Sequence, residues 1–256
     1  MELAKNRFKH AIAEGELQIG LWSSLCSNLV AEGISQSGFD WIVIDMEHAP
    51  NEVPGVISQL QAMKGGTATP LVRPQWNDFV LIKRLLDAGA QSLVIPYVQN
   101  REEAERAVAA TRYPPHGIRG VSGSSRSSAY GRIKDYFHKA EAELCVIVQV
   151  ETAEALEQLE EIASVDGVDG VFIGPADLSA SLGHLGRMDA DEVQAAIRDA
   201  VERLAKIGKP AGILSASEDD CRRYIEWGFT FVAVGIDGAL LVRGADALAQ
   251  KFGRGG

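Results

Sequence analysis

The chain has 256 residues, of which 46% are hydrophobic and 23% are charged, and it carries only 3 cysteines. This composition excludes a disordered chain, a collagen-like repeat and a disulfide scaffold, and the length allows one large core. With 25 basic and 35 acidic residues the formal net charge is -10, which argues against nucleic acid and an anionic membrane surface as partners.

The first ten residues are charged throughout and lack the apolar core of a signal peptide. Uninterrupted apolar stretches all fall short of the ~20 residues that a membrane helix needs. Cys26, Cys145 and Cys221 lie in or beside apolar runs and do not have the spacing of a metal site. We therefore expect a cytoplasmic protein that does not bind a membrane.

Eight short apolar runs alternate with longer stretches of helical periodicity. The runs are near-continuously apolar, which is typical of strands that are covered on both faces. They span residues 19–25, 41–45, 69–73, 92–96, 144–150, 170–174, 211–215 and 231–235.

The segments between these runs place apolar residues at helical spacing and charged residues on the opposite face. This pattern predicts helices over residues 78–88, 101–111, 152–163, 191–207 and 218–227. A further helix over residues 4–14 is expected to precede the first strand and to cap the bottom of the fold.

Strand and helix repeated eight times in about 250 residues is the pattern of an α/β fold of the (β/α)8 TIM barrel type. We expect residues 1–256 to form one such barrel domain, with the extra N-terminal helix. A doubly wound sheet uses the same units, but it predicts a Gly-x-Gly-x-x-Gly turn after the first strand. The chain reads Ser23-Ser-Leu-Cys-Ser-Asn28 there.

Polar residues end several of the runs, on the rim where a barrel places its active site. Asp45 and His48 follow the second run, Arg73 ends the third, Glu151 follows the fifth and Asp177 follows the sixth. Any one of them could be a satisfied polar group with a purely structural role. Together they favour an active site.

Glu151 and Asp177 come from consecutive strands, which lie ~4.8 Å apart, so both carboxylates can reach a common point. Two anions held that close repel unless a cation lies between them or one is protonated. Oxygen ligands suit a hard divalent ion such as Mg²⁺ or Mn²⁺. The alternative is an acid/base carboxylate pair of the glycosidase kind.

His48 is a candidate general base, since Asp45 lies three residues before it and Asp87, near the end of the helix predicted over residues 78–88, could also meet it. A carboxylate on one imidazole nitrogen fixes the tautomer and raises the basicity of the other. The alternative is a surface histidine at a strand end. Arg73 needs an anion, either a rim carboxylate or the developing oxyanion of a substrate.

None of the nine lysines falls at the top of a predicted strand, which argues against Schiff-base chemistry and favours a metal. The segment Gly174-Pro-Ala-Asp177 opens a loop and a short helix, whose backbone N–H groups could hold a small carboxylate or phosphate.

Several motifs together resemble the HpcH/HpaI family of class II, metal-dependent pyruvate aldolases. They include Phe39-Asp-Trp-Ile-Val-Ile-Asp-Met-Glu-His48, Gln149-Val-Glu-Thr152 and Gly167-Val-Asp-Gly-Val-Phe-Ile-Gly-Pro-Ala-Asp-Leu-Ser179. The resemblance covers essentially the whole chain. It implies a (β/α)8 barrel in a homohexamer, a dimer of trimers with C-terminal helices exchanged between neighbours.

The resemblance also implies roles for individual residues. Glu151 and Asp177 match the ligands of Mg²⁺, Mn²⁺ or Co²⁺, Arg73 matches the contact to the substrate's keto oxygen, and His48 matches the base, supported by Asp45 and Asp87. The matched substrate-binding positions are Arg73, Gln149, Gly174, Pro175, Ala176 and Asp177, with Trp22 and Leu214 as pocket walls.

The implied reaction is reversible aldol cleavage of a 4-hydroxy-2-oxo acid to pyruvate, or a related 2-oxo acid, plus an aldehyde. The loop Ser122-Gly-Ser-Ser-Arg-Ser-Ser128 departs from the family pattern and is expected to border the aldehyde site. Alternatives that use the same metal-enolate site are an oxaloacetate decarboxylase and a citramalyl-CoA-type lyase. A binding or assembly module would have no need for the four rim residues His48, Arg73, Glu151 and Asp177.

Overall fold

Eight parallel strands form a closed barrel in the computed structural model, which describes residues 1–254. The order around the barrel follows the chain, and β8 closes on β1. This confirms the predicted TIM barrel, and the ends of the strands differ from prediction by one or two residues at most. The strands are β1 (Gln18–Ser23), β2 (Trp41–Asp45), β3 (Thr69–Arg73), β4 (Ser92–Ile95), β5 (Cys145–Val150), β6 (Gly170–Ile173), β7 (Ala211–Leu214) and β8 (Phe231–Ile236).

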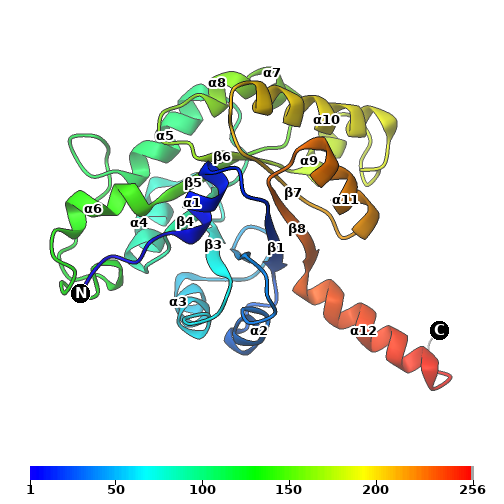
Figure 1. The fold of residues 1–256 in the computed structure, drawn as a ribbon, viewed down its shortest axis with the longest axis horizontal. Coiled ribbons are helices and arrows are strands. Elements are labelled where there is room, and N and C mark those ends of the chain that lie inside the picture. The colour runs from blue at the N-terminus through cyan, green and yellow to red at the C-terminus, as the bar shows by residue number, and fades with distance from the viewer. Residues whose placement is uncertain (255–256) are drawn as a thin grey trace.

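Helices surround the barrel and connect successive strands (Figure 1). The helix predicted over residues 152–163 is divided in two at Gln158, whose φ of -103° and ψ of 16° interrupt the α geometry. The helices are α1 (Arg7–Ala13), α2 (Asn28–Ile34), α3 (Val53–Ala62), α4 (Phe79–Asp87), α5 (Arg101–Thr111), a 3-10 turn (Arg126–Ser128), α6 (Tyr136–Glu143), α7 (Ala153–Glu157), α8 (Leu159–Ala163), α9 (Pro175–Ser181), α10 (Asp191–Lys206), α11 (Glu218–Trp227) and α12 (Asp237–Lys251).

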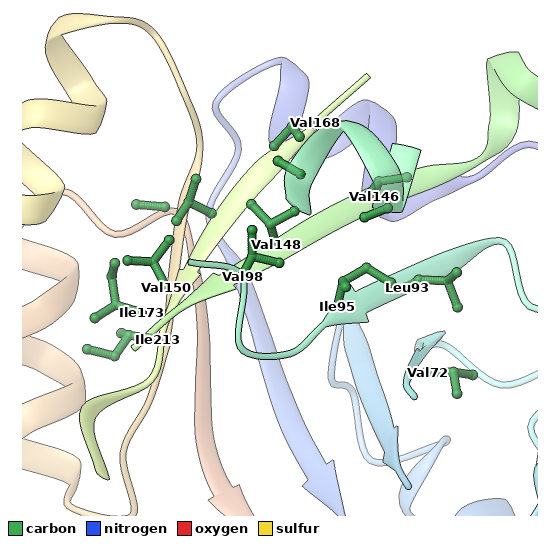
Figure 2. Packing of buried hydrophobic residues seen from close by; sticks show 14 of the residues in the cluster. Val72, Leu93, Ile95, Val98, Val146, Val148, Val150, Val168, Ile173 and Ile213 are labelled. Carbon is green, nitrogen blue, oxygen red and sulfur yellow. The ribbon is translucent and has the colours of Figure 1, made fainter. Parts of the chain in front are cut away.

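The strand residues divide into an outer and an inner apolar layer, because successive side chains on a strand point to opposite faces. On β5 the outer layer takes Val146, Val148 and Val150, which pack with residues of the surrounding helices. Figure 2 shows part of this layer, with Val150 close to Ile173 and Ile213 of the next two strands. The alternate residues therefore face the barrel axis.

Aromatic side chains fill the lower part of the barrel. Phe8 of α1 is fully buried and packs edge-on against Phe231, with ring centroids 5.6 Å apart, and against Trp41 at 5.7 Å. The expected N-terminal helix therefore does close the amino-terminal end of the barrel. The open end is left at the carboxyl termini of the strands.

Helix α12 projects away from the barrel to the C-terminal end of the chain (Figure 1). Only Asp237, at its start, is buried, and it accepts hydrogen bonds from the backbone of Ser24 and Leu25. Within residues 1–254, no helix has the length and apolar character to cross a membrane.

We predict that Gly212→Ala destabilises the barrel, because a Cβ at this position would overlap the ring of Phe231. Overpacking of this kind costs about 1–3 kcal/mol. Gly33→Ala is the matched control, since this helical glycine has no atom within 4 Å of the added Cβ. In chemical denaturation, the denaturant concentration at the unfolding midpoint should be lower than in the wild type only for Gly212→Ala. Equal midpoints for both variants would contradict the packing described here.

Candidate active site

A cavity of about 430 Å³ lies at the carboxyl-terminal ends of the strands. Its lining comes from residues at or just after the ends of most of the strands. Every site residue expected from the sequence lines it except Asp87, namely Trp22, Asp45, His48, Arg73, Gln149, Glu151, Gly174, Pro175, Ala176, Asp177 and Leu214.

A hollow of similar size, about 450 Å³, lies at the other end of the barrel beside α1. Its charged side chains already have partners in the fold. Asp169 accepts a hydrogen bond from the backbone of Val146 and pairs with Lys9, and Lys209 donates to the carbonyl of Val168. The candidate active site is therefore the cavity at the carboxyl-terminal ends of the strands.

Strand pairing brings the inward residues of this end together. Asp45 and Arg73 are the last residues of β2 and β3 and are direct partners in the parallel register. Gln149 occupies the corresponding inward position on β5, two residues after Ile147 of the inner layer. Alternate residues of each strand face the barrel axis. The same alternation that gives the apolar interior therefore also gives a layer of polar side chains at the carboxyl-terminal ends of the strands.

Arg73 forms a two-pronged ion pair with Asp45. Its Nε and Nη2 donate to the two carboxylate oxygens at 2.8 and 2.7 Å, and its guanidinium lies 4.9 Å from the centre of the Trp22 ring. Burial alone would raise the pKa of Asp45, but the hydrogen bonds and charge of Arg73 outweigh it and lower that pKa. Asp45 is therefore ionised and holds Arg73 in place.

Glu47 is a second carboxylate on Arg73, and it was not among the expected site residues. Its Oε2 lies 2.6 Å from Arg73 Nη1 and 4.0 Å from His48 Nε2. Burial raises the pKa of Glu47, against the lowering effect of Arg73. Its position two residues after a strand-terminal aspartate is the signal in the sequence that could have identified it.

Glu151 is buried in the cavity and has no basic partner among residues 1–254. Its Oε1 accepts a hydrogen bond from the Tyr97 backbone at 2.9 Å, and its Oε2 accepts one from Gln149 Nε2 at 2.5 Å. Burial, together with the charges of Glu47 and Asp177, raises the pKa of Glu151 to about 7. This carboxylate is therefore destabilised as an anion in the protein alone.

Comparisons with known proteins identify the family of this chain. Residues 18–244 match the HpcH/HpaI aldolase/citrate lyase family. The chain belongs to this family. It is 57% identical to a 4-hydroxy-2-oxo-heptane-1,7-dioate aldolase of Klebsiella pneumoniae over 96% of this chain and 94% of that protein.

A second curated relative is a pyruvate aldolase of Rhizobium etli, 54% identical over 98% of this chain and 99% of that protein. The crystal structure of an HpcH/HpaI family protein from Burkholderia cenocepacia matches with a TM-score of 0.94 at 39% identity, covering 97% of this chain and 99% of that one. The names of these relatives support a carbon–carbon lyase for this member of the HpcH/HpaI family.

The residues around Glu151 fit a divalent metal ion. A Cβ at Gly174 would overlap Glu151 Oε2, so the glycine leaves room for this carboxylate. Gln149 Oε1 is buried without a hydrogen-bond partner, which leaves an acceptor for a water or ligand. Glu151 and Asp177 offer hard oxygen donors, and a cation beside them would relieve the repulsion that raises the pKa of Glu151.

The metal site would have two protein ligands. Within residues 1–254, no group of three or more His, Cys, Asp or Glu side chains is arranged to hold a metal ion. A hard ion such as Mg²⁺ prefers six oxygen ligands and usually keeps several waters. Two carboxylates in this HpcH/HpaI family protein would leave about four positions for substrate and water.

The expected pairing of His48 with Asp45 is not present. Both oxygens of Asp45 are engaged by Arg73, and Oδ1 also accepts the backbone N–H of Glu47. The loop after β2 carries His48 outward, and its side chain is 65% exposed. Three residues of spacing do not bring these groups together, because Asp45 points into the barrel and His48 follows it in a loop.

Asp87 does not meet His48 within the single chain that the structure describes, and its support of His48 stays a prediction. Asp87 is the last residue of α4, which returns the chain to the amino-terminal ends of the strands. Its carboxylate accepts a hydrogen bond from the buried Arg119 at 3.2 Å. A site formed by a single chain therefore leaves Asp87 out.

The loop over residues 122–128 lies at the same end of the barrel as Asp87. Arg126 donates to the carbonyl of Ala88, just after α4, at 2.6 Å. None of these residues lines the cavity. The expectation that the loop borders the aldehyde site therefore stays a prediction, which the cavity of a single chain does not test.

We predict that binding of Mn²⁺ to this protein weakens as the pH falls below about 7, because the ion must displace a proton from Glu151. Displacement of one proton lowers the affinity about tenfold for each pH unit below that value and has no effect well above it. Isothermal titration calorimetry between about pH 5.5 and 8 measures this slope. Glu151→Gln should bind weakly without such a slope, and an unchanged wild-type affinity over this range would contradict the prediction.

Proposed function

We propose that this protein is a divalent-metal-dependent aldolase that reversibly cleaves 4-hydroxy-2-oxo acids to pyruvate, or a related 2-oxo acid, and an aldehyde. The observation that carries the proposal is the unpaired, buried Glu151 in one cavity with Asp177 and with Arg73. The names of two relatives, at 57% and 54% identity, support the same reaction.

Glu151 and Asp177 would hold the metal ion, for which Mg²⁺, Mn²⁺ and Co²⁺ are the candidates. When bound, the ion would supply Lewis-acid polarisation of the 2-oxo acid. The proposal for the protein's own residues is that they orient the substrate, stabilise the charge that develops on it and move one proton.

Arg73 would stabilise the oxygen that becomes negative when the C3–C4 bond breaks. A guanidinium has five N–H donors, and Asp45 takes two of them through Nε and Nη2. The terminal nitrogens keep further N–H groups for a substrate oxygen. Since Asp45 and the ring of Trp22 fix the guanidinium, little reorganisation is needed during the reaction.

His48 would act as the base that takes the proton of the 4-hydroxyl, directly or through a water. Its side chain lines the cavity and is 65% exposed, so its proton can pass to solvent. Loss of this proton starts the cleavage, which releases the aldehyde and leaves the other fragment as an enolate. Return of a proton to its C3 carbon gives pyruvate, and the same steps in reverse give addition.

The remaining lining residues would bind the oxo acid. Gly174, Pro175 and Ala176 place backbone at the cavity beside Glu151, where a substrate carboxylate would lie, and Gln149 offers its free Oε1 to a donor. Trp22 and Leu214 would form apolar walls.

We also propose a homohexamer, a dimer of trimers in which C-terminal helices are exchanged. Helix α12 supports this, because its exposed Leu240, Leu241, Val242 and Leu248 are 53% to 63% accessible in the single chain. Exposed apolar clusters of this kind mark contact surfaces. A monomer mass from light scattering would contradict the assembly.

The cytoplasm is the proposed location, which the three free cysteines support.

The test is purified protein with pyruvate, a panel of aldehydes and Mn²⁺ or Mg²⁺, with and without EDTA. We expect aldol products that EDTA abolishes. Arg73→Ala should lose on the order of 3 kcal/mol of transition-state stabilisation, which is more than a hundredfold in rate.

The control for this variant is Arg106→Ala, because Arg106 is 66% exposed on α5. Undiminished turnover by Arg73→Ala, or full activity in EDTA, would contradict the proposed function. Decarboxylation of oxaloacetate without any aldol product would favour the alternative reaction at the same site.

A further inference from the structure

We propose that Glu47 is a positioning residue, which holds the positive charge of Arg73 away from Glu151 and Asp177 and so keeps these two carboxylates free for a metal ion. This inference rests on the proposed function, because it concerns how the metal site is kept open. Glu47 itself does not line the cavity and acts through Arg73.

The first observation is how the charge of Arg73 is shared. Its Nε and Nη2 face Asp45, and its Nη1 lies 2.6 Å from Glu47. Every nitrogen of the guanidinium therefore faces a carboxylate of the β2 end. No ion pair within 4.0 Å joins Arg73 to Glu151 or Asp177, among the residues that the structure describes.

The second observation is that Glu47 is held firmly enough to do this. Its backbone N–H donates to Asp45 Oδ1 at 3.0 Å, so the chain at Glu47 is tied to the Asp45 carboxylate. Asn51 in turn donates to the backbone carbonyl of Asp45 at 2.6 Å. The Glu47 side chain is only 14% exposed, and Arg73 is 8% exposed.

The third observation is the competition inside the cavity. Arg73 and Glu151 line the same space, and Glu151 has no basic partner. A buried guanidinium pairs with whatever carboxylate is in reach, since an unpaired charge there is costly. Without Glu47, Asp45 alone would hold the guanidinium. The Arg73 side chain could then swing as a whole toward Glu151 or Asp177 and would occupy the place of the metal ion.

A simpler role for Glu47 would be purely electrostatic, as one more negative charge that attracts a cation. Both roles predict weaker metal binding in Glu47→Gln, which keeps the shape of the side chain and removes its charge. They differ when Arg73 is absent. If Glu47 acts mainly through Arg73, the substitution has a much smaller effect in an Arg73→Ala background than in the wild type, whereas a purely direct electrostatic effect persists there in full.

The experiment is a double-mutant cycle on Mn²⁺ affinity, measured by calorimetry near pH 8 with wild type, Glu47→Gln, Arg73→Ala and the double variant. We expect Glu47→Gln to weaken Mn²⁺ binding by between about tenfold and a hundredfold, which is the range found for residues outside the ligand shell that support a metal site. In the Arg73→Ala background the same change should weaken binding several-fold less than in the wild type, because only the direct effect of the Glu47 charge on Glu151 remains.

Equal losses in the two backgrounds, or no loss in either, would overturn the proposal. Glu102→Gln on the exposed surface of α5 is the matched control, and thermal melting shows whether each variant is folded. Glu47→Asp, which keeps the charge, should recover part of the affinity if Glu47→Gln is unstable. Failure of the wild type to bind Mn²⁺ would instead overturn the proposed function, so the two failures are distinct.

Discussion

The site depends on a division of charge among four buried or half-buried groups. Asp45 and Glu47 neutralise Arg73, and Glu151 is left without a positive partner. An unpaired carboxylate in such a place is unfavourable as an anion, which the raised pKa of Glu151 reflects. A divalent cation between Glu151 and Asp177 would remove this penalty. On this account, Glu151 would be available to a metal ion because Arg73 is already paired with Asp45 and Glu47.

The barrel makes this division possible through its alternation of side chains. Residues that point outward on the strands pack against the helices, and those that point inward fill the axis with aromatic rings below and polar groups above. Parallel register then sets Asp45 directly beside Arg73. Gly174 completes the arrangement, since a larger residue would displace the Glu151 carboxylate.

The strands, the barrel and the shared cavity could be predicted from the sequence, because near-continuous apolar runs between helical segments are typical of strands covered on both faces. Pairings between individual side chains could not. Asp45 and His48 are three residues apart, but a strand ends between them, so one faces Arg73 and the other faces solvent. Asp87 lies at the end of α4, which runs back toward the amino-terminal ends of the strands and so carries Asp87 away from the cavity. Glu47 is recognised only when its distance to Arg73 is known.

The central claim is that Glu151 and Asp177 would hold a divalent ion, which would supply the Lewis-acid polarisation that enolisation of a small 2-oxo acid requires. Exchange of the pyruvate methyl protons for deuterium, followed by NMR in D₂O without any aldehyde, isolates this step from acceptor binding. Exchange should be rapid with Mn²⁺ or Mg²⁺, absent with a chelator and absent in Glu151→Gln. Equal exchange by the chelated enzyme, or by Glu151→Gln, would contradict the account.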